Sequence, residues 1–407
     1  MKSLGPSFNR LWSASLFGNL ADGLLRTAAP LLAISLTDDP VKISIISAIV
    51  MLPWLLFAIP VGGLVDRVDR RIAIAGSNAI RFLAVAFAAL IIANESMTIE
   101  YLYLLSFVVG VCEVVADTAA QAMVPQLLDE SQYESGNSRL QMSETVVSDF
   151  VGAPTSGFLY AAAIFLPFIA TSLGFLVAAI LVLFIPVQLK RDLGKDSTDS
   201  DKGDSFFQSL QFGIKYLYED KHLFRLVLTT TGLGFAFSAS NAVVSLFMIK
   251  QLGLAPAFFG LVLTVQGIGA LLGAATTTRW TKHFSRGNVM ATSMLLTTLI
   301  TFAIGFAPNI IVFTLLATTT GYLITIWNIL LMSTYQTLIP NELFGRIHGA
   351  RRTLVWGMMP IASIVGGFIA RTGLAMPFIV GGAAATVIAA TNYRFIRSIG
   401  DTNKTSS

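Results

Sequence analysis

Long apolar runs of roughly 20 residues, separated by short charged segments, fill most of this sequence. A helix needs about 20 apolar residues to cross the hydrocarbon core of a bilayer. The composition agrees, because 54% of the 407 residues are hydrophobic and 12% are charged, whereas soluble domains carry about 25% charged residues. The sequence therefore predicts an all-α membrane protein with room for about twelve transmembrane helices joined by short loops.

We expect six spans in each half of the chain, with ends set by the apolar runs. The spans of the first half are expected at residues 11–36, 43–61, 72–93, 99–122, 140–163 and 166–187. Those of the second half are expected at residues 226–249, 256–278, 289–307, 310–334, 353–370 and 372–393. Similar short segments at 120–125 and 335–340 indicate that the halves repeat each other, in parallel about an axis along the membrane normal.

This pattern predicts two six-helix bundles, at residues 1–189 and 222–394, joined by a cytoplasmic linker at 190–221. The linker is polar at first and then carries apolar residues at helical spacing: Phe206, Phe207, Leu210, Ile214 and Leu217. This spacing predicts an amphipathic helix that lies on the membrane surface. A polar cytoplasmic tail is expected at 395–407.

The distribution of basic residues predicts the orientation. Of the 27 lysines and arginines, Lys42, Lys250 and Arg371 fall on one face, Arg26 and Arg81 fall within spans, and the other 22 fall on the opposite face. Cytoplasmic loops carry the excess of Lys and Arg. We therefore expect a multi-pass protein of the plasma (inner) membrane with both termini in the cytoplasm.

Several classes of function find no support in the sequence. The net charge of +4 comes from basic residues in loops, which argues against a nucleic-acid partner. The three histidines form no metal-ligand cluster, and no phosphate-binding loop of the Gly-x4-Gly-Lys-Ser/Thr type occurs. No pairing of nucleophile and base stands out, so we expect no enzymatic activity, no cofactor and no metal.

The segment 62–71, GGLVDRVDRR, carries five charges between two apolar runs and predicts a tight turn at a membrane surface. Its spacing resembles the loop signature Gly-x-Leu-x-Asp-Arg-x-Gly-Arg-Arg/Lys of the major facilitator superfamily, with Asp69 in place of the second Gly. The resemblance extends over essentially the whole chain. It implies a transporter of two pseudo-symmetric six-helix bundles that works by alternating access.

The same resemblance implies a gating role for this loop on the cytoplasmic side, carried by Gly62, Asp66, Arg70 and Arg71. A solvated turn that only sets the orientation would explain the arginines but not Gly62 and Asp66. Asp69 adds a negative charge, and it strains the backbone if the position requires a positive φ.

Seven ionisable residues fall within the predicted spans, all of them in the first half: Asp22, Arg26, Arg81, Glu113, Asp117, Glu144 and Asp149. A charge that faces lipid near the bilayer centre costs about 2.5–3.5 kcal/mol or more, so these side chains are expected to face a partner or a wet cavity. Five carboxylates oppose two arginines, so at least one carboxyl group should exchange protons near the working pH. We assign proton coupling to Asp22, Arg26, Glu113 and Asp117.

Helical spacing supports this assignment. The first span places Ser15, Asn19, Asp22 and Arg26 in one polar stripe. In the superfamily the first and fourth spans of each half line the central cavity, so the resemblance places Asp22, Arg26 and Glu113 beside a substrate path and makes Asn19 a cavity residue. A static ion pair between Asp22 and Arg26 is an equally good interpretation.

Position within the spans favours a structural role for several of the charged residues, including Asp117. Asp117, Glu144 and Asp149 lie nearer the cytoplasmic end, where hydration is easier, and Arg81 is expected to be a structural counter-ion. Glu144 belongs to a second polar stripe, whose members are Asn137, Gln141, Glu144 and Ser148.

The segment 152–157 resembles the Gly-Pro-x-x-Gly-Gly signature of drug–proton antiporters, with Ala153 inserted and Ser156 in place of a Gly. Its residues Gly152, Pro154 and Gly157 predict close helix packing and a kink. In the second half the candidates for substrate contact are uncharged: Phe235, Phe237, Asn241, Gln266, Tyr322, Trp327 and Asn328. An aromatic and amide-lined wall suits bulky organic molecules, although ordinary helix packing explains any one of them more simply.

Together these features indicate a proton-coupled exporter of a small organic compound, such as a drug or siderophore, which we expect to act as a monomer in the bilayer. The segments 12–22, 120–125 and 152–157 look most like the branch of enterobactin exporters and macrolide efflux carriers. A solute importer of the same fold and a non-transporting membrane protein for lipid handling or sensing are the alternatives, because a fold does not fix direction or cargo.

Overall fold

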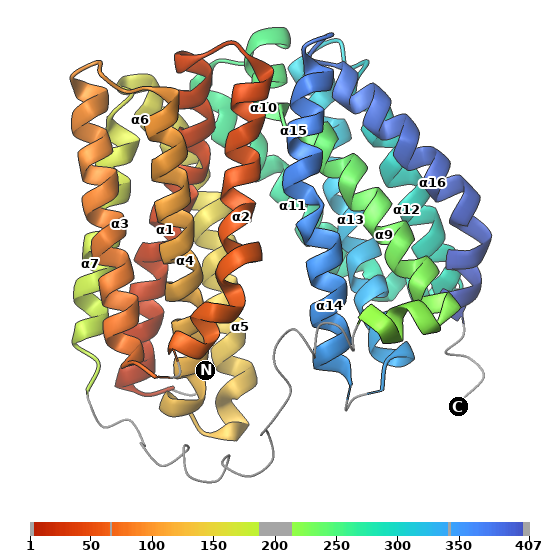
Figure 1. Cartoon of the computed structure of the whole chain (residues 1–407), viewed down its shortest axis with the longest axis horizontal. Helices are drawn as coiled ribbons and strands as arrows, with labels where there is room; N and C mark the ends of the chain where they lie inside the picture. Colours follow the sequence, from red (N-terminus) through yellow and green to blue (C-terminus); the bar gives the residue numbers. More distant parts are fainter. Residues whose placement is uncertain (1–3, 66, 187–213, 341–342, 402–407) are drawn as a thin grey trace. The chain divides into compact units, whose positions relative to one another are not determined.

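The computed structural model describes residues 4–65, 67–186, 214–340 and 343–401 (Figure 1). Across these residues the protein is built of helices and has no β-strand. The contacts divide the chain into two compact units. The first contains Met1–Asp38, Ile49–Asp199 and Leu254–Thr264, and the second contains Asp39–Ala48, Ser200–Gly253 and Val265–Ser407. The boundaries fall inside helices α2 (Pro40–Val65) and α11 (Phe259–His283), so each of these helices contributes residues to both units.

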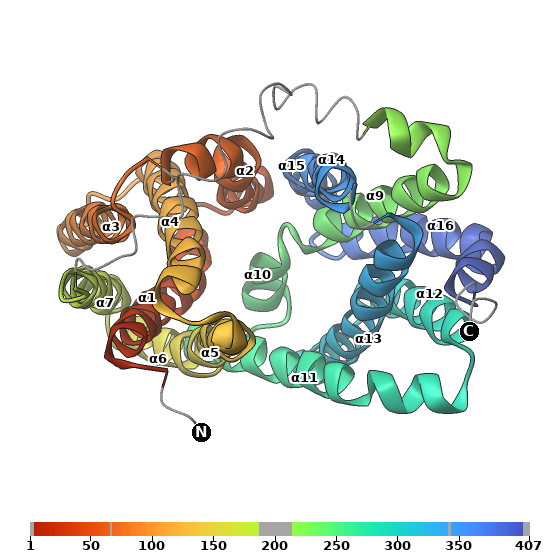
Figure 2. The same cartoon turned by 90° about the horizontal axis from the view of Figure 1, so that it is seen from below.

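The first unit is organised around α1 (Pro6–Leu36). This helix packs against α7 (Leu166–Leu183), α4 (Ile99–Leu127) and a long helical stretch, while α7 and α4 both pack against α3 (Arg70–Ala93) (Figures 1 and 2). The long stretch consists of η1 (Glu130–Gln132), α5 (Tyr133–Ser143), the π-helix η2 (Glu144–Gly152) and α6 (Ala153–Ala162). The 3-10 turn η5 (Pro256–Phe258), which precedes α11, packs against α6.

The second unit is organised around α12 (Arg286–Ile304), which packs against α13 (Ile310–Leu338) and α16 (Met376–Asp401) (Figure 2). Helix α9 (Lys221–Asn241) packs against α16, α14 (Phe344–Gly357) and α15 (Met359–Ala370). The short helix α10 (Val244–Leu246) and the π-helix η4 (Phe247–Gln251) follow α9. A cluster of apolar side chains that includes Met290, Leu330 and Tyr335 forms the core of this unit.

Polar residues at the helix starts explain where several helices begin. Asp69, Thr98, Asp220, Ser285 and Asn309 each accept a hydrogen bond from a backbone N–H in the first turn of the following helix. The first N–H groups of a helix lack partners within the helix, so these side chains satisfy donors that would otherwise be unpaired.

Ten helical segments among the described residues are long and apolar enough to cross a membrane. The predicted spans 11–36 and 140–163 are helical but are not among the ten. The first carries Asn19, Asp22 and Arg26, and the second carries Gln141, Glu144 and Asp149, and these polar side chains lower the hydropathy of both segments. The two least apolar of the predicted spans are therefore the two that carry the polar stripes.

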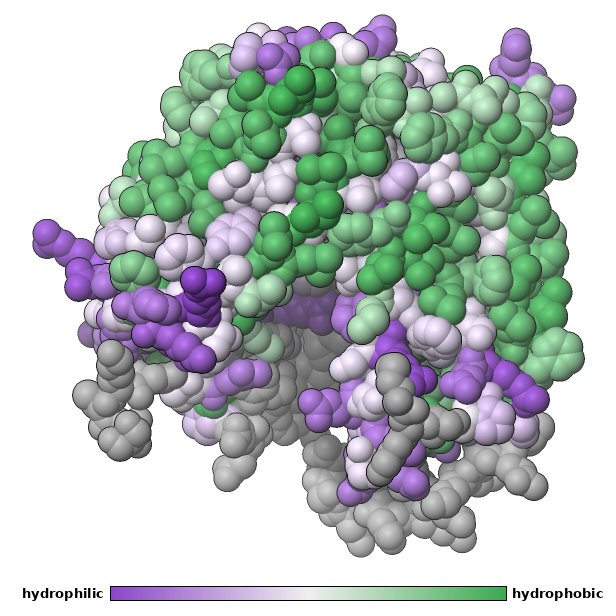
Figure 3. All heavy atoms as spheres, turned by 180° about the vertical axis from the view of Figure 1, so that it is seen from behind, coloured by the Kyte–Doolittle hydropathy of each residue, from purple (hydrophilic) through white to green (hydrophobic). Residues whose placement is uncertain are grey.

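The molecular surface supports a membrane environment. On the face drawn in Figure 3, apolar side chains cover the middle of the helices and hydrophilic side chains gather toward the ends. Large apolar side chains such as Leu83, Phe87 and Leu90 on α3 are more than 60% exposed. Only lipid solvates such a surface without a large penalty.

The predicted linker helix lies mainly outside the described residues, since Phe206, Phe207 and Leu210 are among the residues not described. Its end, residues 214–219, is helical, and Leu217 packs into the core cluster of the second unit. Near its C-terminus the chain remains helical, because α16 continues to Asp401, beyond the predicted span 372–393. Its last turns bury Phe395, Ile396 and Ile399, which keeps them helical.

Candidate functional site

The polar stripes of α1 and of the α5–η2 stretch meet in one cavity of about 510 Å³ inside the first unit. Side chains of α1, α3, α4, α5, η2 and α7 line it. The polar lining consists of Ser15, Asn19, Asp22, Asn78, Arg81, Asp117, Gln121, Asn137, Gln141 and Glu144. Asn78 and Arg81 are buried, whereas Gln121, Asn137 and Gln141 are exposed, so the polar wall runs from a buried floor to an exposed rim.

At the floor of the cavity, Asp22 forms an ion pair with Arg81 of α3. The Arg81 side chain is only 2% exposed, and its guanidinium stacks on the ring of Phe175 at 3.9 Å from the ring centre. Arg81 Nη1 also donates to Asn78 Oδ1 at 3.4 Å. The interpretation that Asp22 pairs with Arg26, four residues along its own helix, is therefore wrong, because α3 brings a buried guanidinium to Asp22 instead.

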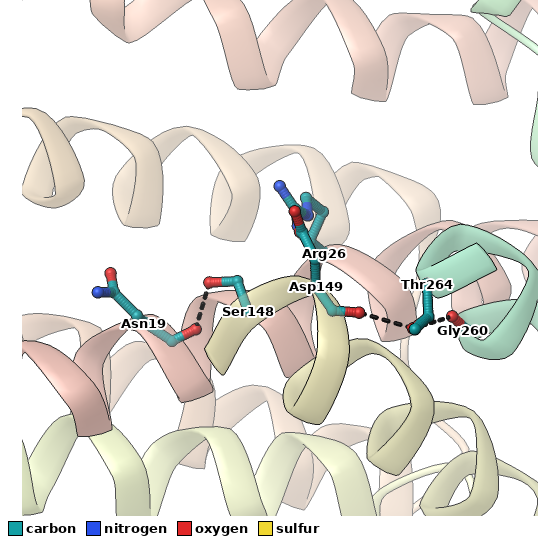
Figure 4. A network of polar contacts seen from close by, with 6 residues as sticks. All are labelled: Asn19, Arg26, Ser148, Asp149, Gly260 and Thr264. Carbon is teal, nitrogen blue, oxygen red and sulfur yellow. Dashed lines mark hydrogen bonds and ion pairs between the residues drawn. The ribbon is translucent and has the colours of Figure 1, made fainter. Parts of the chain in front are cut away.

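Arg26 pairs with Asp149 of the π-helix η2 (Figure 4). The same short stretch makes two further contacts: Ser148 Oγ donates to the backbone oxygen of Asn19 at 2.8 Å, and Thr264 Oγ1 of α11 donates to the backbone oxygen of Asp149 at 2.6 Å. A π-helix leaves backbone oxygens without their usual α-helical partners, and it commonly marks a functional site. Here η2 joins α1 to the start of α11 through Arg26, Asp149 and Thr264.

Close backbone packing holds η2 against α1. A Cβ atom on Gly23 would lie 2.5 Å from the backbone oxygen of Ser148, and one on Gly152 would lie 3.0 Å from Gly23 Cα. Gly157 is in a similar position, because its Cβ would lie 2.6 Å from the backbone oxygen of Ala257. Pro154 sits in the first turn of α6, directly after the π-helix. Small residues let the helix backbones approach this closely.

Three of the five intramembrane carboxylates have no basic side chain within ion-pair distance among the residues described. Asp117 and Glu144 line the cavity, and Glu144 accepts a hydrogen bond from Gln141 Nε2 at 3.1 Å. Glu113 is half-buried on α4, one helical turn from Asp117, and does not line the cavity. Asp22 and Asp149 are thus each paired with an arginine, whereas Glu113, Asp117 and Glu144 have no basic partner among the described residues.

The structure corrects the interpretation of the loop at 62–71. Asp66 is outside the described residues, and Gly62 lies in the last turns of α2 rather than in the turn. Asp69 has a φ of −63° and is the N-cap of α3, so the position does not need the glycine of the family signature. Its carboxylate accepts hydrogen bonds from Arg71, and these hydrogen bonds lower the pKa of Asp69.

The arginines of this loop bind helix ends within the first unit. Arg70 Nη1 donates to the backbone oxygen of Ala122 near the end of α4, and Arg71 Nη1 donates to that of Ile185 just after α7, both at 2.8 Å. The carbonyl group of Ile185 lies beyond the last turn of α7 and therefore lacks a partner within that helix. Basic residues near a helix C-terminus also interact favourably with its dipole.

The seven candidates of the second half lie in different surroundings. Trp327 packs in the core cluster, and Asn241 donates to the Phe237 backbone oxygen of its own helix at 2.9 Å. Tyr322 lines an apolar cavity of about 310 Å³ between α11, α12 and α13, where its hydroxyl accepts hydrogen bonds from Thr276 and Trp280. Phe235 and Gln266 are half-buried, and Asn328 is exposed.

Sequence reasoning missed Asn78, whereas it expected Arg81 to be a counter-ion, and Arg81 pairs with Asp22. Both lie on α3, which has few polar side chains, and their spacing of three residues places them on one face of that helix. An amide and a guanidinium at this spacing in an apolar span are a signal that could have been read as a polar contact with another span.

Comparisons with known proteins agree with this architecture. The sequence profile of the transmembrane secretion effector family matches residues 5–406. Macrolide efflux protein A of Streptococcus pyogenes is 21% identical over 386 residues, which cover 94% of each chain. The crystal structure of the nucleoside transporter NupG resembles this chain with a TM-score of 0.74 at 15% identity and covers 96% of this chain and 99% of that one. The crystal structure of a bacterial homologue of the iron transporter ferroportin, in an inward-facing state, has a TM-score of 0.73 at 14% identity. The match covers 96% of this chain and 100% of that one.

Proposed function

Because this chain belongs to the transmembrane secretion effector family of the major facilitator superfamily, we propose that it is a proton-coupled exporter of a small organic compound. As a member of this family it is a multi-pass membrane transporter and not an enzyme. Export is supported by the likeness to Macrolide efflux protein A over 94% of each chain. The compound moves by alternating access of one site to the two sides of the membrane.

The observation that carries the proton coupling is the set of intramembrane carboxylates without a cation. Glu113 and Asp117 of α4 have no ion-pair partner among the described residues, and Glu144 faces the same cavity as Asp117. An ionised carboxylate is expensive inside a membrane unless it is paired or hydrated. Proton uptake at Glu113 or Asp117 removes that penalty and lets the empty carrier change face.

Asp22 and Arg26 serve this coupling in different ways. Asp22 is held by Arg81 in the cavity that also contains Asp117, so a proton on either acid changes the charge around the other. Arg26 and Asp149 connect α1 to η2, and η2 contacts α11 through Thr264. A change in the charge of α1 can therefore be transmitted to the start of α11.

The proposal includes the arrangement in the membrane. Twelve spans form two six-helix bundles, at 1–189 and 222–394, around the linker 190–221, with the tail at 395–407. The distribution of Lys and Arg supports a cytoplasmic location for both termini. We also propose that the protein is a monomer in the plasma membrane. The segment 62–71, with Gly62 at the end of α2 followed by Asp66, Arg70 and Arg71, gates the cytoplasmic side.

Transport into inverted membrane vesicles tests this function. Vesicles that contain the protein should accumulate a labelled macrolide, siderophore or dye when their lumen is acid, and a protonophore should abolish the accumulation. Asp117→Asn and Glu113→Gln should each reduce coupled uptake at least tenfold while the protein stays in the membrane. Uptake that is unchanged by the protonophore would rule out proton coupling. Accumulation in intact cells that express the protein, instead of depletion, would indicate import.

A further inference from the structure

The charge balance of the cavity in the first unit is negative. Asp22 and Arg81 neutralise each other at the floor, which leaves Asp117 and Glu144 as the other charged side chains of the lining. Neither carboxylate has a basic partner within ion-pair distance in the described part of the chain. Two uncompensated carboxylates at the wall of one cavity attract a cation and repel an anion.

A second observation concerns Asn78, which is only 4% exposed and lines the same cavity. Its side-chain oxygen accepts from Arg81, whereas its amide nitrogen donates to no residue that the structure describes. The Asn78 residue is buried, but this nitrogen is not among the described side-chain atoms that are buried without a partner, so it is open to the cavity, where a ligand or water can accept its hydrogen bond. The amide nitrogen therefore favours a cavity ligand that presents a hydrogen-bond acceptor, such as an ether, hydroxyl or carbonyl oxygen.

The cavity suits an organic cation better than a metal ion. Its volume of about 510 Å³ falls within the range of about 300–1,000 Å³ that is usual for drug-sized ligands. The described residues contain no group of three or more His, Cys, Asp or Glu side chains that could hold a metal ion. The rest of the polar wall is made of amides and a hydroxyl, from Ser15, Asn19, Gln121, Asn137 and Gln141, which match neutral oxygen and nitrogen atoms.

We propose that this cavity binds an oxygen-bearing organic cation, with its positive charge at Asp117 and Glu144 and an acceptor oxygen at the amide nitrogen of Asn78. The inference rests on the proposed export function and narrows its cargo, because it favours cationic compounds and disfavours anionic ones such as deprotonated siderophores. It assigns Glu144 a contact with the cargo in place of the structural role that sequence reasoning favoured.

Binding to the purified full-length protein tests the inference separately from transport. Rhodamine 123 and fluorescein share a xanthene core with oxygen atoms but carry opposite charges. Fluorescence anisotropy should show that the wild type binds rhodamine 123 at least tenfold more tightly than fluorescein. Glu144→Gln and Asp117→Asn should each weaken the binding of rhodamine 123 about tenfold, which is the effect expected for the loss of one charge-assisted contact.

Two variants guard against trivial explanations. Glu95→Gln removes an exposed carboxylate from the turn between α3 and α4, outside the cavity, and should leave both affinities unchanged. Glu144→Asp keeps the charge and should retain rhodamine 123 binding within about threefold, so a loss in Glu144→Gln alone cannot be ascribed to misfolding.

Asn78→Leu tests the amide contact. It should weaken rhodamine 123 binding without changing the preference for the cation.

Equal or tighter binding of fluorescein, or an equal loss in Glu95→Gln and Glu144→Gln, would overturn the cation site. Failure of the vesicle experiment for every compound, with rhodamine 123 binding intact and sensitive to Glu144→Gln, would overturn the export function and leave the cation site standing. If the vesicles transported neutral or anionic compounds only, the export function would stand and the cation site would be overturned.

Discussion

Arg81 of α3 holds Asp22 of α1 in an ion pair, although the two residues are 59 positions apart and Arg26 lies one helical turn from Asp22. Arg81 is almost completely buried, with a 2% exposed side chain, while the side chain of Asp22 is 25% exposed. Removing one member of a buried pair leaves an uncompensated charge, which is more damaging than removing both.

Arg81→Ala should therefore lower the free energy of unfolding in detergent by about 3 kcal/mol. It also removes the contact with the ring of Phe175, which should add to the loss. The double variant Arg81→Ala with Asp22→Asn should recover part of this loss, because no charge is left unpaired. Thermal unfolding followed by circular dichroism measures both variants. Equal destabilisation in the single and double variants would show that the ion pair itself contributes nothing.

The close contact between Gly23 and η2 gives a second prediction. A Cβ at Gly23 would lie 2.5 Å from the backbone oxygen of Ser148, and a backbone atom cannot move aside as a flexible side chain can. Gly23→Ala should lower the free energy of unfolding by about 1–3 kcal/mol. Gly76→Ala on α3 is the matched control, because a Cβ there meets no atom within 4 Å. It should be neutral or stabilise by up to about 1 kcal/mol, since Ala favours a helix over Gly.

The ion pair between Asp39 and Arg371 predicts a pH dependence. Arg371 Nη2 lies 2.7 Å from Asp39 Oδ2, and the hydrogen bonds from Arg371 are the main cause that lowers the pKa of Asp39. A carboxyl group whose pKa is lower in the folded protein stabilises it above the unfolded pKa of about 3.9, and this contribution is lost as the pH falls through the folded pKa. Both side chains are partly exposed, at 28% and 52%, so we expect a small effect that salt weakens.

Asp39→Asn should accordingly lower the unfolding temperature at pH 6, and its difference from the wild type should shrink as the pH falls below about 4. Arg371→Gln should show the same dependence, and the double variant should add nothing to either single one. A difference that stays constant from pH 6 to pH 3 would mean that the pair is not the source of the effect.

The sequence was sufficient for the helices and for the polar stripe of α1, because both follow from spacing along one helix. It could not identify the partner of Asp22. Spacing offered Arg26, but the choice of Arg81 depends on how α3, α7 and α1 pack, which is a property of the tertiary structure. The polar side chains of α1 therefore contact different parts of the protein: Asp22 faces the cavity, and Arg26 is turned toward η2.

Two local features of the backbone could not be predicted from the sequence, for a different reason. The π-helix η2 covers nine residues, Glu144–Gly152, whose side chains do not distinguish it from an ordinary helix. The glycines Gly62 and Gly63 suggested a turn, but both are helical, since α2 continues to Val65. In both places the local sequence preference is weak and does not specify the backbone conformation.

The two ion pairs of α1 should respond differently to the loss of their arginines. The side chain of Arg26 is 60% exposed and that of Asp149 is 32% exposed, so water can hydrate either charge when its partner is removed. Arg26→Gln should thus cost no more than about 1 kcal/mol of unfolding free energy, well below the loss expected for Arg81→Ala. Its effect should appear in coupled transport, because Arg26 binds the η2 segment whose Asp149 backbone oxygen holds Thr264 of α11. Thr264→Val removes that hydrogen bond and should impair transport in the same vesicles with an equally small change in stability. Wild-type rates in both variants, measured at equal protein levels, would show that the contact between η2 and α11 has no part in the transport cycle.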